Sequence, residues 1–405
     1  MLKKKSNRSH INSLCRGYFM VIQHICFKII GLAPWSIDKR NADQMNFKKH
    51  NKCNFSYVGT CYNILFFTFN VFLNFNFLIN KAYQPFDSEQ ALPSTLREKI
   101  SFILPLIINM IPLVFVIRQK SMIGIINRFE IVDEKLKKCD DYKMNSDYNN
   151  YFTFIVNFVL FNGLFMMQIY NFSFTVLFIQ ISYTIISSGV MIQYTILLNL
   201  TAQRFEKVNS LISKLYNIRI DVARIHILSS IQTPLSYEQL LLYDINDIIY
   251  AYVELCEICD NLKNFYGFPI LVITLFFSAG GVFILYFIIL VLISIIPFSN
   301  QVYMNLTLVS WITFSLIALT SSVTKTIEQS QKTVKLVNLL MLRPFTNHKI
   351  KEQLAQFSSV ISHLKVKFTA CDIMPLDRSL LAIISSTIAT YLVIAVQFRM
   401  GSPAD

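Results

Sequence analysis

Long stretches without a single Asp, Glu, Lys or Arg divide this sequence. They cover residues 55–80, 100–117, 149–203, 264–324 and 379–398, and they are 26, 18, 55, 61 and 20 residues long. A helix needs roughly 20 apolar residues to cross the hydrocarbon core of a bilayer. The first, second and fifth stretches therefore predict one membrane helix each, and the third and fourth predict two each. The pattern predicts an all-α membrane protein with seven transmembrane helices.

Turn-forming residues lie inside both double-length stretches. Asn171 and Ser173 interrupt the third stretch, and Pro297 interrupts the fourth. Asn and Ser compete for helical backbone bonds, and Pro lacks a backbone N–H. Pro105 and Pro112 are expected to bend the second helix. The expected membrane helices are residues 55–79, 100–117, 151–170, 172–200, 268–296, 303–323 and 379–398.

Several charged segments between the stretches also have helical periodicity. In the segment that follows the fourth membrane helix, Phe205, Val208 and Leu211 recur at three-residue spacing, with charged residues between them. An apolar helix face must be buried against something. We therefore expect a layer of packed helices, an anchor beneath the membrane domain. The expected amphipathic helices are residues 201–231, 237–263, 325–342 and 349–364, and a further amphipathic or partly inserted helix is expected within residues 11–34.

The basic residues indicate the orientation. The chain has 37 Lys and Arg residues and a formal net charge of +13, and 33 of these basic residues lie before residue 53 or within residues 118–143, 204–263 and 325–378. Basic loops remain in the cytoplasm. The N-terminus is therefore expected inside and the C-terminus outside, and the net charge reports topology rather than nucleic-acid binding.

These assignments predict seven consecutive regions. They are a cytoplasmic N-terminal segment with an amphipathic helix (1–54), transmembrane helices one to four (55–200), a cytoplasmic helical extension (201–263), transmembrane helices five and six (264–324), cytoplasmic anchor helices (325–378), the last transmembrane helix (379–398) and an extracellular tail (399–405).

The sequence lacks the motifs of the common enzyme classes. It has no Gly-rich phosphate loop, no His-Glu-x-x-His and no Gly-x-Ser-x-Gly, so we expect neither an enzyme nor a bound cofactor. Cys256 and Cys259 have the spacing of zinc ligands, but no second Cys or His pair is close in sequence, so no metal site is predicted. No carboxylate lies at membrane depth, which argues against a proton-coupled pump or an intramembrane protease.

Neutral polar and aromatic residues occur inside the predicted membrane helices. Such residues either bond neighbouring helices or line a cavity for a polar, uncharged organic molecule. Trp311, one of two Trp residues, could stack on a ring or a sugar face. The ligand-binding candidates in the outer half are Asn162, Gln168, Gln180, Tyr183, Tyr286, Thr307 and Trp311.

The last membrane helix contains the most informative motif. Thr390-Tyr391 is followed by five apolar residues and then by Gln397-Phe398 close to the C-terminus. This pattern resembles the insect gustatory receptors. The segments Phe368–Cys371 and Ile30–Pro34 are also similar to segments that members of the family carry at these places. Ala395 and Val396 are smaller than the residues often found there.

The resemblance implies a tetrameric cation channel with the seventh helices around a central pore. Ile394, Gln397 and Phe398 are spaced so that they share one helix face. Spacing alone leaves Gln397 either in the pore or at the membrane interface, and the resemblance favours the pore. Gln397 is then the polar filter, because amide oxygens can partly replace the water of a cation, and Ile394 and Phe398 form the hydrophobic gate.

The expected function is a tastant-gated, non-selective cation channel in the plasma membrane of chemosensory neurons. The expected partners are a small-molecule tastant, either a sugar or a bitter plant compound, monovalent and divalent cations, the lipid bilayer, and sister subunits in a homotetramer or heterotetramer. The alternatives are a seven-helix G-protein-coupled receptor, which needs an extracellular N-terminus, and a small-solute membrane transporter. The absence of an internal repeat leaves the transporter without support from inverted symmetry.

Overall fold

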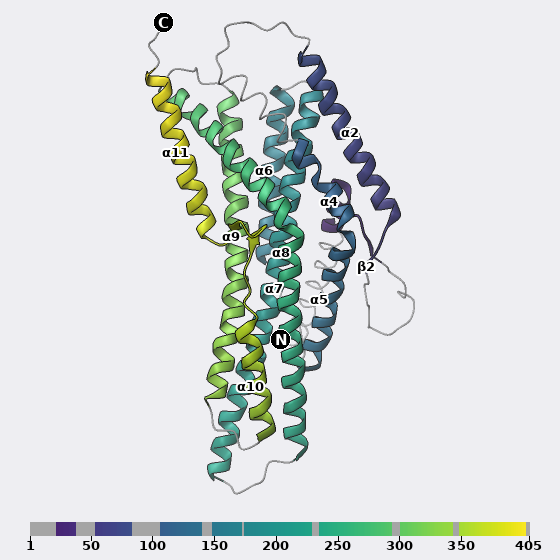
Figure 1. Ribbon diagram of the computed structural model, residues 1–405, viewed down its shortest axis with the longest axis vertical. Coiled ribbons are helices and arrows are strands. Elements are labelled where there is room, and N and C mark those ends of the chain that lie inside the picture. The colour runs from purple at the N-terminus through teal and green to yellow at the C-terminus, as the bar shows by residue number, and fades with distance from the viewer. Residues whose placement is uncertain are drawn as a thin grey trace, which may run out of the picture.

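The computed structural model is an elongated bundle of helices (Figure 1). It describes residues 22–37, 53–82, 106–139, 148–171, 174–228, 235–293, 300–342 and 348–401. The elements are a helix over residues 22–30, β1 (Ser36–Ile37), β2 (Cys53–Asn54), α2 (Tyr57–Ala82), α4 (Ile111–Ile117), α5 (Gln119–Cys139), α6 (Tyr148–Asn171), α7 (Phe174–Leu228), α8 (Leu235–Leu292), α9 (Asn300–Met341), α10 (His348–His363), β3 (Thr369–Ala370), β4 (Met374–Pro375) and α11 (Ser379–Gly401).

Three long helices connect the two ends of the molecule. The helices α7, α8 and α9 contain 55, 58 and 42 residues, so at ~1.5 Å per residue each is much longer than a bilayer is thick. The sequence correctly predicted that the fourth membrane helix extends beyond the membrane. It divided α8 and α9 into separate membrane and amphipathic helices, whereas each is continuous, and α8 passes through Pro269 without ending.

The second predicted membrane helix is part of a bent pair. Residues 106–117 form the membrane part, and the chain then turns by 63° into α5. The sequence predicted a bend at Pro105 and Pro112, but the 63° bend lies at Arg118, after Ile117, and Pro105 lies outside the described residues. The basic residues of α5 were interpreted as a loop, whereas they lie on a helix. Six apolar or amide side chains along α5 are buried, namely Gln119, Met122, Ile125, Phe129, Val132 and Leu136.

Six helices of the described chain are long and apolar enough to cross a membrane, or seven if the bent pair counts as one span. The all-α membrane fold with about seven spans is thus confirmed. The predicted loop between the first two spans and the last residues of the tail lie outside the described residues, whereas residues 399–401 extend α11.

Helices pack side by side in a layer in the lower part of Figure 1. We call α5, α10 and residues 201–228, 235–263 and 325–341 of the long helices the basal layer. Most of its apolar side chains join the core of the membrane domain, and Ile245, Leu340, Ile350 and Leu354 form a second, smaller cluster. Arg204 in α7 binds Asp133 in α5 through two bonds of 2.9 and 2.8 Å and lies 4.4 Å from the centre of the Phe129 ring. Lys135 binds Asp247 in α8 at 2.7 Å. Ion pairs thus attach α5 to α7 and α8.

The segment that follows the helix over residues 22–30 is irregular and buried. Gly31 has a φ of 85°, which favours glycine, and Leu32 is fully buried. Three side-chain amides satisfy its carbonyls: Asn63 of α2 donates to the oxygen of Gly31 at 2.6 Å, Gln193 of α7 to Leu32 at 3.2 Å, and Gln119 of α5 to Pro34 at 3.0 Å. Non-helical backbone within a membrane protein needs such internal partners. We call this segment, residues 31–35, the wedge, because three helices close around it.

Candidate functional site

The helix α11 lies at one edge of the bundle, at the upper left of Figure 1, beside α8 and α9. It begins where Asp377 accepts a bond from the backbone N–H of Ser379 at 2.9 Å, a typical N-terminal cap. One face packs inward through Leu380 and Ile384, which are buried. Ile388 approaches Gly281 of α8 so closely that a Cβ there would lie 3.1 Å from its Cδ1. The remaining surface of α11 is open in the single chain.

The open surface of α11 has a polar stripe. Ser386, Thr390, Ile394 and Gln397 are exposed, and their spacing of four, four and three residues places them along one side of the helix. Ser386 and Gln397 lie furthest around the helix from the buried Ile384, and Ile394 lies nearest to Leu380. Ser386 and Thr390 donate their hydroxyl hydrogens to carbonyls within their own helix, at 2.9 Å each. Their oxygens therefore remain available as acceptors. We call these four residues the α11 stripe.

The motif residues are placed differently around α11. Gln397 and Ile394 belong to the α11 stripe, and Ile394 is 40% exposed. Tyr391 is 56% exposed on a neighbouring part of the helix surface. Phe398 lies in α11, but its side chain falls outside the described residues. Sequence reasoning did not select Ser386, although its four-residue spacing from Thr390 was visible.

Trp311, the aromatic ligand candidate on α9, is buried against α6 and α8. Its indole nitrogen donates to the side-chain oxygen of Asn157 in α6 at 2.9 Å, and Ser188 of α7 also donates to this oxygen, at 3.3 Å. Asn157 is buried and joins three helices. The sequence analysis did not select Asn157, and the only available signal was an amide in an otherwise apolar stretch.

A chain of aromatic rings connects Trp311 with a second candidate, Tyr183. The Trp311 ring lies 5.3 Å from Phe277, Phe277 lies 6.1 Å from Phe276, and Phe276 lies 5.3 Å from Tyr183. The two outer contacts have edge-to-face geometry, which aromatic pairs favour. Residues far apart in the sequence are thus brought into one aromatic cluster in the membrane domain.

The other candidates are more scattered. Thr307 lies one turn before Trp311 and contacts the Met167 sulfur of α6 at 3.7 Å. Gln168 is buried, and Asn162 donates to the carbonyl of Phe158 within its own helix at 2.7 Å. In the described part of the chain, no hydrogen bond or ring contact joins the side chain of Gln180 or Tyr286 to another candidate. The half-buried candidates are Asn162, Gln180, Tyr183, Tyr286 and Thr307.

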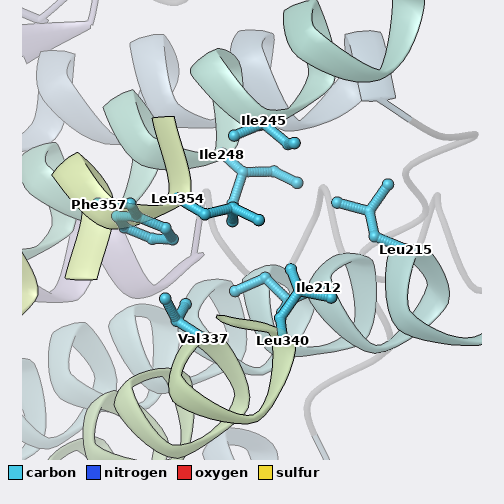
Figure 2. Close-up of a pocket in the computed structure, with 8 residues that line it drawn as sticks. All are labelled: Ile212, Leu215, Ile245, Ile248, Val337, Leu340, Leu354 and Phe357. Carbon is cyan, nitrogen blue, oxygen red and sulfur yellow. The ribbon is translucent and has the colours of Figure 1, made fainter. Parts of the chain in front are cut away.

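Two cavities lie elsewhere in the described structure. One, of about 10 Å³, is enclosed by apolar side chains of α7, α8, α9 and α10 in the basal layer, as Figure 2 shows. This volume is about that of one water-sized probe, and its lining carries no polar group, so it suits neither a water nor a ligand. The other, of about 80 Å³, lies between the α4–α5 bend, α8 and the turn between β3 and β4. No ligand candidate lines either cavity.

Cys256 and Cys259 lie on α8 in the basal layer. Both are free thiols and both are buried. Within the ranges that the structure describes, no three His, Cys, Asp or Glu residues come close enough to hold a metal ion.

Comparison with known proteins supplies the family context. A profile described as 7tm chemosensory receptor matches residues 22–402. The Drosophila melanogaster protein "Putative gustatory receptor 28b" is 37% identical over 89 residues, 22% of this chain and 19% of that protein. "Putative gustatory receptor 28a" is 26% identical over 171 residues, 40% of this chain and 37% of that protein. The matches therefore span about a fifth and about two fifths of these relatives.

Two solved structures have a similar fold. The insect olfactory receptor OR5 from Machilis hrabei has a TM-score of 0.62 and 11% sequence identity, over 95% of this chain and 99% of that chain. The same receptor in complex with eugenol has a TM-score of 0.63 and 10% identity, over 94% and 98%. At these identities the likeness concerns the fold alone.

Proposed function

Since the chain belongs to the 7tm chemosensory receptor family, we propose that it is a gustatory receptor that works as a tastant-gated, non-selective cation channel. Family membership agrees with the resemblance that the C-terminal motif indicated. The chain is a multi-pass membrane protein, and its proposed location is the plasma membrane of chemosensory neurons.

The observation that carries the proposal is the α11 stripe. A membrane helix that faces lipid is apolar, because a polar side chain loses its hydrogen bonds with water there. The α11 stripe is polar at Ser386, Thr390 and Gln397, and all three side chains are exposed in the single chain. The Ser386 and Thr390 hydroxyls donate within their own helix, so Gln397 is the group that most needs water. A water-filled path between copies of the chain would supply that water and a second wall.

We infer four copies around one axis, each contributing α11 to the pore. Four Gln397 amides then form a ring whose oxygens replace part of the water around a cation, and Ile394 and Phe398 close the path by excluding water. The basal layer joins the subunits on the cytoplasmic side. Exposed apolar residues there, among them Leu339 and Val360, suit an interface between copies.

The tastant is proposed to bind in the outer half of the membrane domain. The half-buried candidates Tyr183 and Thr307 lie next to the cluster that encloses Trp311. A ligand that binds them would therefore also press on the side chains packed around Trp311. Trp311 and Gln168 are buried and would act as the floor of such a site. The olfactory receptor bound to eugenol supports a small organic ligand for this fold. Sugar and bitter compounds remain the two proposed classes.

The test is a recording of current from oocytes that express the full chain during exposure to a panel of sugars and bitter compounds. Gln397→Glu should place four carboxylates in the pore and strengthen block by divalent cations by tenfold or more, since a charged ring holds such ions far more tightly than an amide ring. Gln397→Asn, which keeps the amide, is the matched control and should leave divalent block close to that of the wild type. Unchanged selectivity and block in Gln397→Glu would contradict the pore assignment.

The orientation has its own test. Epitope tags on intact cells should expose the C-terminus and conceal the N-terminus, as the distribution of basic residues predicts. A C-terminal tag that reacts only after permeabilisation would exclude the proposed pore direction and would reopen the alternative of a G-protein-coupled receptor or a transporter.

A further inference from the structure

The cavity of about 80 Å³ is formed by three parts of the chain that are distant in sequence. Arg118 comes from the bend between α4 and α5, Lys263 from α8, and Thr369 and Asp372 from the β3–β4 turn. A Cβ on Gly267 would lie 3.1 Å from the backbone nitrogen of Cys371, so the turn lies directly against α8. The turn leads through Pro375 and Asp377 into α11.

The cavity lies at the edge of the membrane domain. Arg118 directly follows the uncharged residues 100–117, and Lys263 directly precedes the uncharged residues 264–324. Each is thus the first charged residue outside a membrane helix. Arg378, at the start of α11, occupies the same position relative to residues 379–398. The two cationic side chains of the cavity therefore lie at the depth of the lipid headgroups.

The charges of the cavity favour an anion. The Arg118 guanidinium is exposed and donates through one nitrogen to the carbonyl of Asn264 at 2.6 Å. A guanidinium has five N–H donors, and no other bond engages it within the described chain. Lys263 lies 3.2 Å from the carboxylate of Asp372. Two cations and one carboxylate thus line the cavity, which leaves a net positive charge.

The single acidic group is placed to exchange with a ligand. Asp372 is largely exposed, with 76% of its side chain accessible. It lies on a tight turn with a φ of 55°, and Thr369 donates to it at 2.8 Å. The bonds from Thr369 and Lys263 hold the pKa of Asp372 below its usual value, so it is ionised at neutral pH. An anion that binds Lys263 would replace this carboxylate.

We propose that this cavity binds the phosphate headgroup of an anionic membrane lipid. Arg118 and Lys263 bind phosphate oxygens, and Lys263 gives up its bond with Asp372. A lipid rather than a soluble phosphate is the occupant because the cavity lies at the membrane edge, on the basic side of the protein, where anionic lipids concentrate in the cytoplasmic leaflet. The β3–β4 turn is then the link between the bound lipid and α11.

The test uses the purified full-length protein in phosphatidylcholine nanodiscs with a small fraction of phosphatidylinositol bisphosphate, and native mass spectrometry counts the bound lipid. Arg118→Gln and Lys263→Gln should each weaken binding about tenfold, because each removes a charge-assisted bond. Asp372→Asn should strengthen binding several-fold, because it removes the competing carboxylate. Lys332→Gln, an exposed position on α9 outside the cavity, should bind like the wild type.

The opposite expected effects of Lys263→Gln and Asp372→Asn on lipid binding distinguish a binding site from a structural ion pair. Lys263→Gln and Asp372→Asn break the same ion pair, so a purely structural role predicts the same direction for both. A gain in Asp372→Asn supports the site even if Lys263→Gln folds poorly, since misfolding does not create affinity. Wild-type binding in Asp372→Asn would overturn the proposal.

Two further outcomes also overturn it. Equal losses in Lys332→Gln and Lys263→Gln would indicate a diffuse attraction to basic surface. Full competition by inositol trisphosphate at the concentration of the lipid would assign the cavity to a soluble phosphate compound. This test measures bound lipid and does not measure current. The lipid proposal can therefore fail while the channel proposal stands, and the channel proposal can fail while the lipid proposal stands.

Discussion

Single side chains with buried polar atoms specify how the membrane helices pack. Asn157 accepts hydrogen bonds from Trp311 and Ser188, so one amide fixes the relative positions of α6, α7 and α9. Removing this amide would lower the stability of the protein, because a buried N–H without an acceptor loses the bonds it made with water. Trp311 is therefore positioned by a partner that lies 154 residues away in the sequence.

Asn157→Leu should destabilise the protein by about 1–3 kcal/mol, because it leaves the indole N–H of Trp311 buried without an acceptor. The measurement is the thermal unfolding of the purified protein in detergent. Asn162→Leu on the same helix is the control, since the hydrogen bond of Asn162 among the described residues goes to the carbonyl of Phe158 in its own helix. Equal midpoints for the two variants would show that the Asn157 bond does not hold the helices together.

At the scale of elements, the wedge is the feature that pattern analysis was least able to describe. Its residues resembled a family segment in sequence, but its conformation depends on amides from α2, α5 and α7. Close backbone approach adds a steric requirement. Gly59 of α2 lies where a Cβ would be only 2.1 Å from the carbonyl oxygen of Pro34.

Gly59→Ala should therefore destabilise the protein by a few kcal/mol, because either α2 or the wedge must shift. Gly124→Ala in α5 is the matched comparison, since a Cβ there meets no atom within 4 Å. An alanine at an open helical position should stabilise by roughly 0.5–1 kcal/mol. Thermal unfolding of both variants measures the difference, and a stabilised Gly59→Ala would contradict the packing of the wedge against α2.

At the scale of the whole molecule, the single chain is incomplete at α11. One face of this helix is buried against the bundle through Leu380 and Ile384, and its polar face has no covering element among the residues that the structure describes. The same chain exposes the apolar residues Leu339 and Val360 on the basal layer. The proposed assembly would cover both surfaces, with contacts between copies at the basal layer and an aqueous path along α11.

Cysteine substitution along α11 tests this arrangement. Ser386→Cys, Thr390→Cys and Ile394→Cys should react with a water-soluble, charged thiol reagent, and the reaction should reduce tastant-evoked current by half or more, because the bulky group obstructs the path. Ile384→Cys, on the buried face, should react at least tenfold more slowly. Equal rates on the two faces would mean that the α11 stripe does not border water. Recording current during reagent application gives both rates.

The sequence predicted the membrane helices well for a definite physical reason. Charged side chains are excluded from hydrocarbon, so their absence alone delimits the spans, and the ends of α2, α6 and α11 lie within a few residues of the prediction. It also located the amphipathic helices, because the periodicity of their apolar faces is local. It missed the helix α5, whose basic residues resembled a loop, and the structure shows that two of them, Arg128 and Lys135, pair with carboxylates on α8.

By itself, the sequence determined the fold class, the spans and the C-terminal motif, since each depends on residues that are close together in the chain. Tertiary structure alone decided which side chains meet: the bond between Asn157 and Trp311, the closure of the wedge by three amides, and the cavity that brings Arg118 to Lys263. It also decided that Ser386, Thr390 and Gln397 are exposed in the single chain. The reason is that the preference for lipid or water is a property of each residue, whereas the side chains that a residue contacts depend on how separate helices are arranged in space.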